Sequence, residues 1–349
     1  MVNVRFDLLV SALRRGAPVA LLAAALWLAV TAGLRAAEAE PFFRIGTGSE
    51  AGSEFAVGQV LADVLQQTFT AEDCGLPDCS AAPKLVAAQL SSGSLANLED
   101  LRDGRLEAAL VAAPIAGWAV RGQGPFEASG PMLELRAVAT LYPVVLQVVT
   151  LERSGIRRIG DLRGRRVSLD GQGSGTHPLA LRVLAAYGLG EGDIEGRYLE
   201  PGIALERLAA GRLDAFFALG GVPLEAVSRV NEIAEIRLLP VSAERLAGDE
   251  VLAEAAETMV SLTLPAGAYA GLPEVETLAM SAQLLVGEGL GEDLVYAMTA
   301  SLWSADTERR LRAAHPLGFE IAIDGALEGI EVPLHPGAER FYRERGLLP

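Results

Sequence analysis

The stretch Leu98–Ala108 reads LEDLRDGRLEA, and a near-copy, LERLAAGRLDA, follows at Leu205–Ala215. Each copy places leucines on one helical face, stops at a glycine (Gly104 and Gly211) and continues into an apolar run. A helix, a terminal glycine and a buried strand in this order form an α/β crossover unit. Chance is the alternative, because such helices are common. A true duplication predicts two similar lobes with a ligand cleft between them.

The first 39 residues are predicted to be a signal peptide. They have a basic start, an apolar stretch at Ala17–Gly33 and an A-x-A cleavage pattern at Ala37–Ala39. The alternative is a retained membrane anchor, but the apolar stretch is short for a membrane span and contains Pro18. Cleavage after Ala39 leaves no other long apolar run, which predicts a soluble exported protein with two ordinary domains or one large one.

The net charge and the cysteine content of the chain limit the classes of ligand and partner that it is expected to bind. The formal charge of the chain is −16. So acidic a chain offers no basic patch to neutralise phosphates, which argues against nucleic acid. The two cysteines, Cys74 and Cys79, are expected to form a disulfide in an exported protein, with free thiols as the alternative. Because no histidine or second cysteine pair stands near them, we expect no metal site.

Strands alternate with helices along the chain, which predicts an α/β fold with mainly parallel sheets. Two strand-like runs, Leu135–Leu141 and Val144–Leu151, are separated by Tyr142-Pro143, where we expect a break. The chain is expected to enter the second lobe there and to return near Val260. The predicted organisation is a signal peptide at residues 1–39, a discontinuous first lobe at 40–143 and 260–349, and a second lobe at 144–259.

Two glycine- and serine-rich loops, Gly46–Ser53 and Gly171–Thr176, each stand between a predicted strand and a predicted helix. In open α/β sheets, ligands bind at that position, where the helix start offers N–H groups to an anion. The hydroxyls of Gly173–Thr176 can donate to a carboxylate; a capped tight turn is the alternative. Neither loop has Walker A or dinucleotide-binding spacing. Glu50 and Glu54 are interpreted as surface caps or as acceptors for an amino group.

Three further positions bear on the predicted cleft. Ser94 is expected to cap the helix of the first repeat. Tyr142 stands at the expected lobe crossover, where it either covers a ligand or packs in the hinge. The loops that follow the two repeated strands, Ala112–Pro114 and Leu219–Gly221, are expected to face each other across the cleft.

Few residues suggest catalysis. His177 stands close to Ser174, with Asp170 as an orienting carboxylate, but no Gly-x-Ser-x-Gly turn surrounds the serine. His315 and His335 each precede a proline and are interpreted as structural. No pattern pairs two carboxylates across a cleft, so a glycosidase is not supported. We therefore predict that the protein is not an enzyme.

Several stretches resemble the TAXI family of solute-binding subunits of TRAP transporters, over almost the whole mature length. They are Thr140–Pro143, Ser154–Ile156, Asp161–Ser168, Gly173–Thr176, Ala186–Gly188, Gly211–Phe217, Arg237–Pro240, Pro265–Tyr269 and Val332–Tyr342. Their order and spacing together carry the resemblance. It implies a two-lobed α/β fold of the periplasmic-binding-protein type II class. Such a protein closes on a small carboxylate-bearing solute, such as an amino acid or a dicarboxylate, and delivers it to an ion-driven permease.

The resemblance also implies a ligand-binding set. Carried over by position, it is Gly48, Ser53, Glu54, Ser92, Ser94, Tyr142, Gly173, Ser174, Gly175, Thr176, Phe217 and Gly220. The chain departs from the family pattern at Ser91–Ser94, at Glu54-Phe55 and at Ala112, so the family's usual ligands are not assumed, and a basic ligand group facing Glu54 is one interpretation. A sensor of the same fold and an exported enzyme are the alternative functions. We expect a periplasmic monomer without cofactor.

Overall fold

The computed structural model describes residues 42–349, except residues 73, 247 and 249–257. The predicted signal peptide and its cleavage site after Ala39 lie outside the described residues. Among the helices that the structure describes, none is both long enough and apolar enough to cross a membrane.

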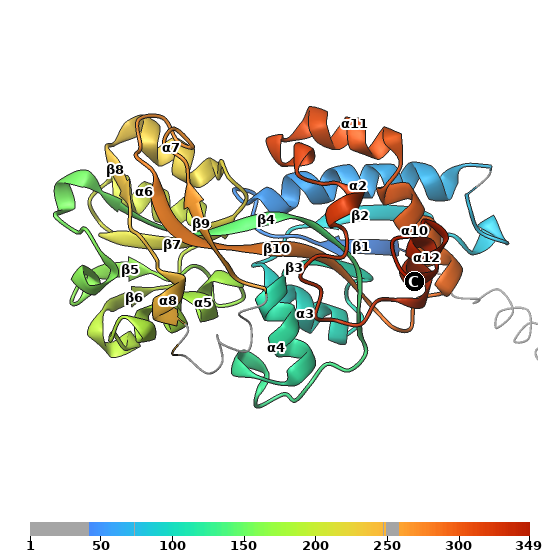
Figure 1. Ribbon diagram of the computed structural model, residues 1–349, viewed down its shortest axis with the longest axis horizontal. Helices are drawn as coiled ribbons and strands as arrows, with labels where there is room; N and C mark the ends of the chain where they lie inside the picture. Colours follow the sequence, from blue (N-terminus) through green and yellow to red (C-terminus); the bar gives the residue numbers. More distant parts are fainter. Residues whose placement is uncertain (1–41, 73, 247, 249–257) are drawn as a thin grey trace, which may run out of the picture. The chain divides into compact units, whose positions relative to one another are not determined.

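One mixed sheet carries the fold (Figure 1). Its strands are β1 (Phe42–Gly46), β2 (Leu85–Gln89), β3 (Ala108–Ala112), β4 (Leu135–Leu151), β5 (Arg166–Ser168), β6 (Glu195–Arg197), β7 (Ala215–Gly220), β8 (Ile236–Leu238), β9 (Val260–Leu264) and β10 (Val275–Gly287). The order β2-β1-β3-β10-β4-β7-β5-β6 is symmetric about its two long central strands. β1 pairs in parallel with β2 and β3, as β5 does with β6 and β7. Each triplet meets a long antiparallel strand, β10 or β4.

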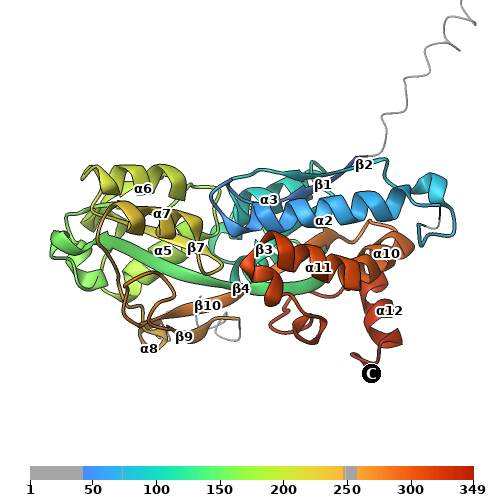
Figure 2. The ribbon, with the colours of Figure 1, turned by 90° about the horizontal axis from the view of Figure 1, so that it is seen from above.

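Helices cover both faces of the sheet (Figures 1 and 2). They are α2 (Ser53–Thr70), α3 (Ser94–Arg102), α4 (Ala113–Arg121), α5 (Thr176–Ala186), α6 (Pro201–Ala209), α7 (Glu225–Ile233), α8 (Ala243–Leu246), α10 (Glu292–Leu302), α11 (Ala305–Ala314) and α12 (Pro336–Glu344). We call β1–β3 with α2–α4 and α10–α12 the first lobe, and β5–β7 with α5–α8 the second lobe. The fold is thus the expected two-lobed α/β type.

The two copies of the repeated stretch occupy equivalent positions in the two lobes. α3 is followed by Gly104 and α6 by Gly211, with φ of 70° and 67°, a left-handed conformation that suits glycine. The strands β3 and β7 then enter the sheet beside β1 and β5, respectively. The duplicated sequence therefore builds a duplicated crossover unit.

An ion pair inside each unit repeats as well. In the first lobe, Glu107 accepts the backbone N–H of Arg44 (2.6 Å) and pairs with its guanidinium (2.7 Å). In the second lobe, Asp214 accepts the backbone N–H of Arg166 (2.9 Å) and pairs with its guanidinium (2.7 Å). Each arginine also donates to the carbonyl of the glycine that ends the helix, at 3.1 and 3.0 Å. The side chains, as well as the backbone topology, are related by the duplication.

β4 is continuous through Tyr142-Pro143, so the expected break between two strands was wrong. Its first part pairs with β10 and its last part with β7 and β8. Register shifts in the β4–β10 pair beside Ala282 and Leu284 accommodate this path. An exposed proline at a register irregularity is tolerated in a strand, because the lost N–H donor costs little there.

The lobes therefore share two long strands. β9 pairs with the first part of β10, and Tyr269, in the turn between them, packs in the hydrophobic core of the second lobe. We accordingly propose that the chain returns to the first lobe along β10. The predicted boundary between the lobes at residue 144 falls within β4 and stays a prediction.

Two local expectations need correction. The N-cap of α3 is Gly93, and Ser94 is the first helical residue, whose hydroxyl instead accepts the backbone N–H of Ala112 at 3.1 Å. The segment Ala112–Pro114 is the direct junction of β3 with α4 and not a loop. Both corrections arise because Ser94 ties the start of α3 to the end of β3.

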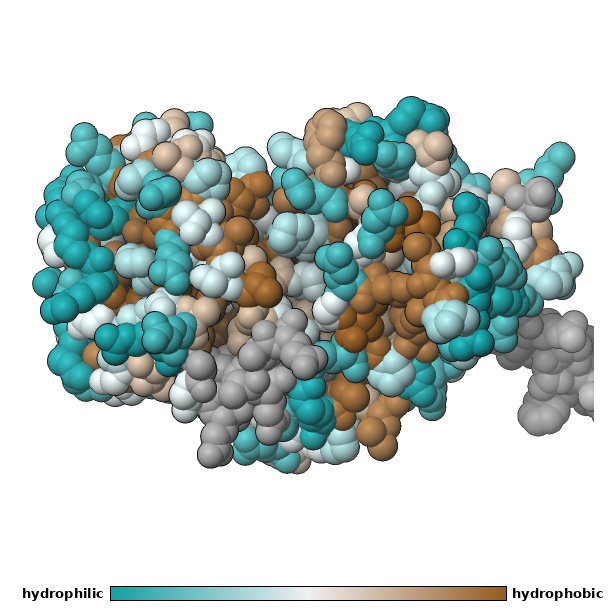
Figure 3. All heavy atoms as spheres, viewed as in Figure 1, coloured by the Kyte–Doolittle hydropathy of each residue, from teal (hydrophilic) through white to brown (hydrophobic). Residues whose placement is uncertain are grey.

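The surface is mixed in character. Figure 3 shows hydrophilic residues concentrated toward both ends of the viewed face, with apolar residues nearer its middle. The most exposed large apolar side chains are Leu133 (69%), Ile233 (65%) and Phe319 (64%). Cys74 and Cys79 form a disulfide that closes the short loop between them.

Candidate ligand-binding site

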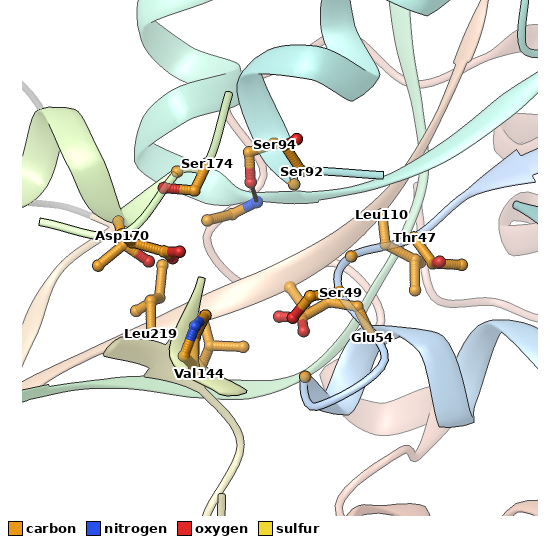
Figure 4. A pocket seen from close by; sticks show the side chains of 18 of the residues that line it. Thr47, Ser49, Glu54, Ser92, Ser94, Leu110, Val144, Asp170, Ser174 and Leu219 are labelled. Carbon is orange, nitrogen blue, oxygen red and sulfur yellow. Dashed lines mark hydrogen bonds between the residues drawn. The ribbon is translucent and has the colours of Figure 1, made fainter. Parts of the chain in front are cut away.

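A polar cleft lies between the lobes, and both lobes contribute to its walls (Figure 4). It is lined by Thr47, Gly48, Ser49, Gly52, Glu54, Ser92, Gly93, Ser94, Leu110, Val111, Ala112, Val144, Asp170, Ser174, Gly175, Thr176, Glu200, Pro201, Leu219, Leu224 and Ala282. The walls come from the ends of β1, β3, β5 and β7, from the starts of α2, α3, α5 and α6, and from Val144 of β4 and Ala282 of β10. This is where ligands bind in α/β sheets. The free volume inside is about 50 Å³, enough for a few water molecules.

Direct hydrogen bonds join the two lobes beside the cleft. The backbone N–H of Ala96 donates to the carbonyl oxygen of Gly173 at 3.0 Å. The backbone N–H of Gly221 donates to Oγ of Ser53 at 3.0 Å. Because each bond has one partner in each lobe, the lobes are in a closed arrangement around the cleft.

Glycines permit this close approach. A Cβ atom at Gly173 would lie 2.9 Å from Cβ of Ser92, and one at Gly175 would lie 2.8 Å from Oγ of Ser94. Both distances are too short for a real side chain. The serine-rich start of α3 and the glycine-rich start of α5 therefore fit together only because one side lacks side chains.

Glu54 brings a carboxylate to the cleft from the first turn of α2. Its own backbone N–H and the hydroxyl of Ser53 lie close to the carboxylate and favour its ionised form. It packs against the first glycine-rich loop, because Cβ atoms at Gly48 and Gly52 would lie 3.4 and 2.9 Å from its Oε2. Burial away from water raises the pKa of Glu54 to about 7.

Asp170 brings a second carboxylate from the other side (Figure 4). It follows β5 with φ of 70°, and its side chain is nearly buried. The carboxylate accepts the backbone N–H of Gly171 at 2.7 Å, and the nearby hydroxyls of Ser174 and Thr176 favour its ionised form. Burial raises the pKa of Asp170 to about 6, and the charge of nearby Glu200 acts in the same direction.

These contacts change the interpretation of the second glycine-rich loop. We predicted that the hydroxyls of Gly173–Thr176 donate to a carboxylate of the ligand. In the structure, the hydroxyls of Ser174 and Thr176 lie beside the protein's own Asp170 and favour its ionised form. The described residues that line the cleft include three acidic side chains and no lysine, arginine or histidine.

Tyr142, on β4 two residues before Val144, is 1% exposed and does not itself line the cleft. Its hydroxyl is next to Ser53 and Glu54, and burial and the charge of Glu54 both raise its pKa. Among the described residues, the hydroxyl has no partner at hydrogen-bond distance and angle. A buried hydroxyl without a partner costs stability unless a ligand or water satisfies it.

The structure brings most of the predicted ligand-binding set together. Those that line the cleft are Gly48, Glu54, Ser92, Ser94, Ser174, Gly175 and Thr176. Ser53 and Gly173 make the contacts between the lobes, and Gly220 lies close to Ser53. Phe217 is fully buried in the core and does not line the cleft. Ala112 and Leu219, from the two segments expected to face each other, both line it.

Asp170 and Glu200 line the cleft but were not predicted to do so, and Asp170 was considered only as part of a hydrolase. A signal was present for Asp170, which directly follows the strand Arg166–Ser168 and Leu169, at the carboxyl edge where ligands bind. Glu200 also follows a strand end, but the polar stretch Glu195–Arg197 has no apolar run that would predict a strand. The exposed Glu50, by contrast, does not line the cleft.

The hydrolase interpretation is not supported by the contacts of Ser174. Its Oγ accepts the backbone N–H of His177 at 3.1 Å. The imidazole of His177 packs edge-on against Tyr198, with 5.4 Å between ring centroids. The Nδ1 atoms of His315 and His335 accept backbone N–H groups at the starts of the helices that follow them.

The fold is shared with known solute-binding proteins. A binding-protein component of an ABC phosphonate transporter from Pseudomonas aeruginosa matches with a TM-score of 0.51 and 8% identity, over 81% of this chain and 80% of that chain. MatC from Rhodopseudomonas palustris, with bound malate, matches with a TM-score of 0.50 and 16% identity, over 82% and 90%. At such identities the likeness concerns the fold alone. The sequence itself matches a family over residues 45–346, and the chain therefore belongs to the NMT1-like family.

Proposed function

We propose that this protein is an extracytoplasmic receptor that captures a small polar solute between its lobes and presents it to a membrane transporter. The observation that carries the proposal is a polar cleft closed by hydrogen bonds from both lobes. Closure around a ligand is the usual way in which two-lobed proteins turn binding into a signal for a partner. The shared fold of transporter-associated binding proteins supports the proposal.

The resemblance to the TAXI family favours a TRAP-type permease as the partner and the periplasm as the location. A sensor of the same fold would bind its solute in the same way but would act without a permease. Uptake of the solute by cells that carry a TRAP-type permease, with and without this protein, distinguishes the two functions.

We also propose that the solute carries a carboxylate group. Fewer hydroxyl groups of the protein are available to donate hydrogen bonds to it than the sequence predicted. The hydroxyls of Ser174 and Thr176 lie beside Asp170 and favour its ionised form. The hydroxyl of Thr47 already donates to the carbonyl of Gln89 at 2.8 Å. The remaining hydroxyls of the first lobe, on Ser49, Ser92 and Ser94, line the cleft and are the candidate donors.

The test is recovery of a bound small molecule. Purified protein is denatured, the released molecule is identified by mass spectrometry, and its rebinding is measured by the melting temperature. A solute at 100 times its dissociation constant should stabilise the folded protein by about 2.7 kcal/mol.

A matched pair of glycine variants makes this test specific to the cleft. Gly173→Val should prevent closure, because its Cβ would collide with Ser92, and should lose the bound molecule. Gly192→Val is the control, since a Cβ there meets nothing within 4 Å. Equal retention by both variants, or the absence of any solute that binds, would contradict the receptor function.

A further inference from the structure

Each lobe presents the start of a helix to the cleft, and each start already holds a carboxylate of the protein. The carboxylate of Glu54 lies at the first turn of α2, and that of Asp170 lies beside the hydroxyls of Ser174 and Thr176 at the start of α5. Helix N-termini favour anions because their N–H groups lack partners. Here the protein's own side chains occupy both positions, so a solute in the cleft meets carboxylate oxygens as well as hydroxyls.

The negative charge in the cleft is not neutralised by its walls. Glu200, just before α6, adds a third carboxylate near Asp170. Within the described part of the chain, no basic side chain lines the cleft. In a confined site of low dielectric, this charge repels an anion and attracts a cation more strongly than it would in water.

Tyr142 provides an independent observation. Its hydroxyl is buried beside Glu54 and has no hydrogen-bond partner among the described residues. A hydroxyl oxygen accepts a hydrogen bond from an N–H donor. A solute with such donors, bound next to Glu54, would lie close to this buried and unpaired hydroxyl.

We propose that the solute carries a protonated amine or guanidinium group that binds between the carboxylates of Glu54 and Asp170. This assignment rests on the proposed receptor function and names its substrate class. N–H donors are required because hydroxyls and carboxylates line the site. Quaternary ammonium groups are usually recognised by aromatic side chains, and the described lining contains none.

The charge of the site predicts the pH dependence of binding. Asp170 and Tyr142 are the titratable groups that face Glu54, and Glu200 faces Asp170. Since burial raises the pKa of Glu54 to about 7 and that of Asp170 to about 6, both carboxyls bind protons near neutral pH. A cation binds to the ionised forms, so its affinity should rise as the pH rises through this range. The affinity of an anion should fall over the same range.

The experiment is isothermal titration of the full protein with probes of different charge. The probes are putrescine and agmatine for the N–H cations, choline for quaternary ammonium, malate and methylphosphonate for anions, and calcium for metal ions. We expect putrescine or agmatine to bind, with an affinity at least tenfold greater at about pH 8 than at about pH 5.5. Glu54→Gln and Asp170→Asn should each reduce that affinity about tenfold or more.

Controls separate binding from folding. Asn tolerates the left-handed backbone at Asp170, and circular dichroism checks that both variants fold. Glu50→Gln, an exposed neighbour in the same loop, should leave the affinity unchanged. Tighter binding of an anion, choline or calcium overturns the assignment while leaving a receptor function intact. If no probe binds and no small molecule is released from the purified protein, the receptor function fails as well.

Discussion

The two cleft carboxylates make the unliganded protein less stable at higher pH. The folded pKa values of about 7 for Glu54 and about 6 for Asp170 lie above their ordinary values of 4.5 and 3.8. Their favourable contribution is therefore complete below the ordinary values and is lost as the pH rises through the folded ones. Each shift corresponds to a contribution on the order of 3 kcal/mol.

We expect Glu54→Gln with Asp170→Asn to remove much of this pH dependence. Urea unfolding without ligand at about pH 5 and about pH 8 measures it. The double variant should lose clearly less stability between these values than the natural protein, whereas Glu50→Gln should behave like the natural protein. Identical pH dependence in all three proteins would show that the two carboxyls titrate normally.

At the residue level, several residues singled out from the sequence line the cleft, Glu54 among them, and their role in binding stays a prediction. Glu54 was noticed because an acidic residue is unusual in a glycine-rich loop at a helix start. The role of Asp170 was not predictable in the same way, because its contacts with Ser174 and Thr176 depend on the fold of the loop. The sequence also did not show that Phe217 lies in the core. Alternate residues of a strand face opposite sides of the sheet, and the sequence alone does not say which side faces the cleft.

At the scale of elements, the repeated ion pair should stabilise both lobes equally. Glu107 and Asp214 each accept a backbone N–H and pair with a partly buried arginine. We expect Glu107→Gln and Asp214→Asn each to lower the free energy of unfolding by about 1–3 kcal/mol. Urea denaturation provides the measurement. Arg229→Gln, which removes only an exposed pair with Glu225, should cost less than about 0.5 kcal/mol. Similar losses in all three variants would argue against a structural role for the repeated pair.

The elements themselves differ in how far the sequence predicts them. The crossover units were predictable because leucine periodicity, a terminal glycine and an apolar run are local signals. The continuity of β4 was not, because Tyr142-Pro143 has the local character of a break. Pairing with β10 on one side and β7 on the other holds the strand together, and neither partner is visible in the neighbouring sequence.

At the scale of the whole described unit, closure of the lobes should determine how long a solute stays bound. Ser53 accepts the backbone N–H of Gly221 across the cleft, so Ser53→Ala removes a contact that exists only when the lobes are closed. We expect its dissociation constant to rise about 3- to 10-fold, as loss of one hydrogen bond implies. The dissociation rate should rise, because the bond with Gly221 holds only the closed form.

Ser91→Ala is the matched control for this prediction. Its hydroxyl bonds Thr47 and Gly93, which belong to the same lobe, so the variant should lose stability without favouring the open form. Stopped-flow release of the solute from both variants separates the two effects. Faster release only in Ser53→Ala links the cross-lobe hydrogen bond to retention of the solute. Equal release rates would mean that closure depends on the loop packing around Gly173 and Gly175 and not on this bond.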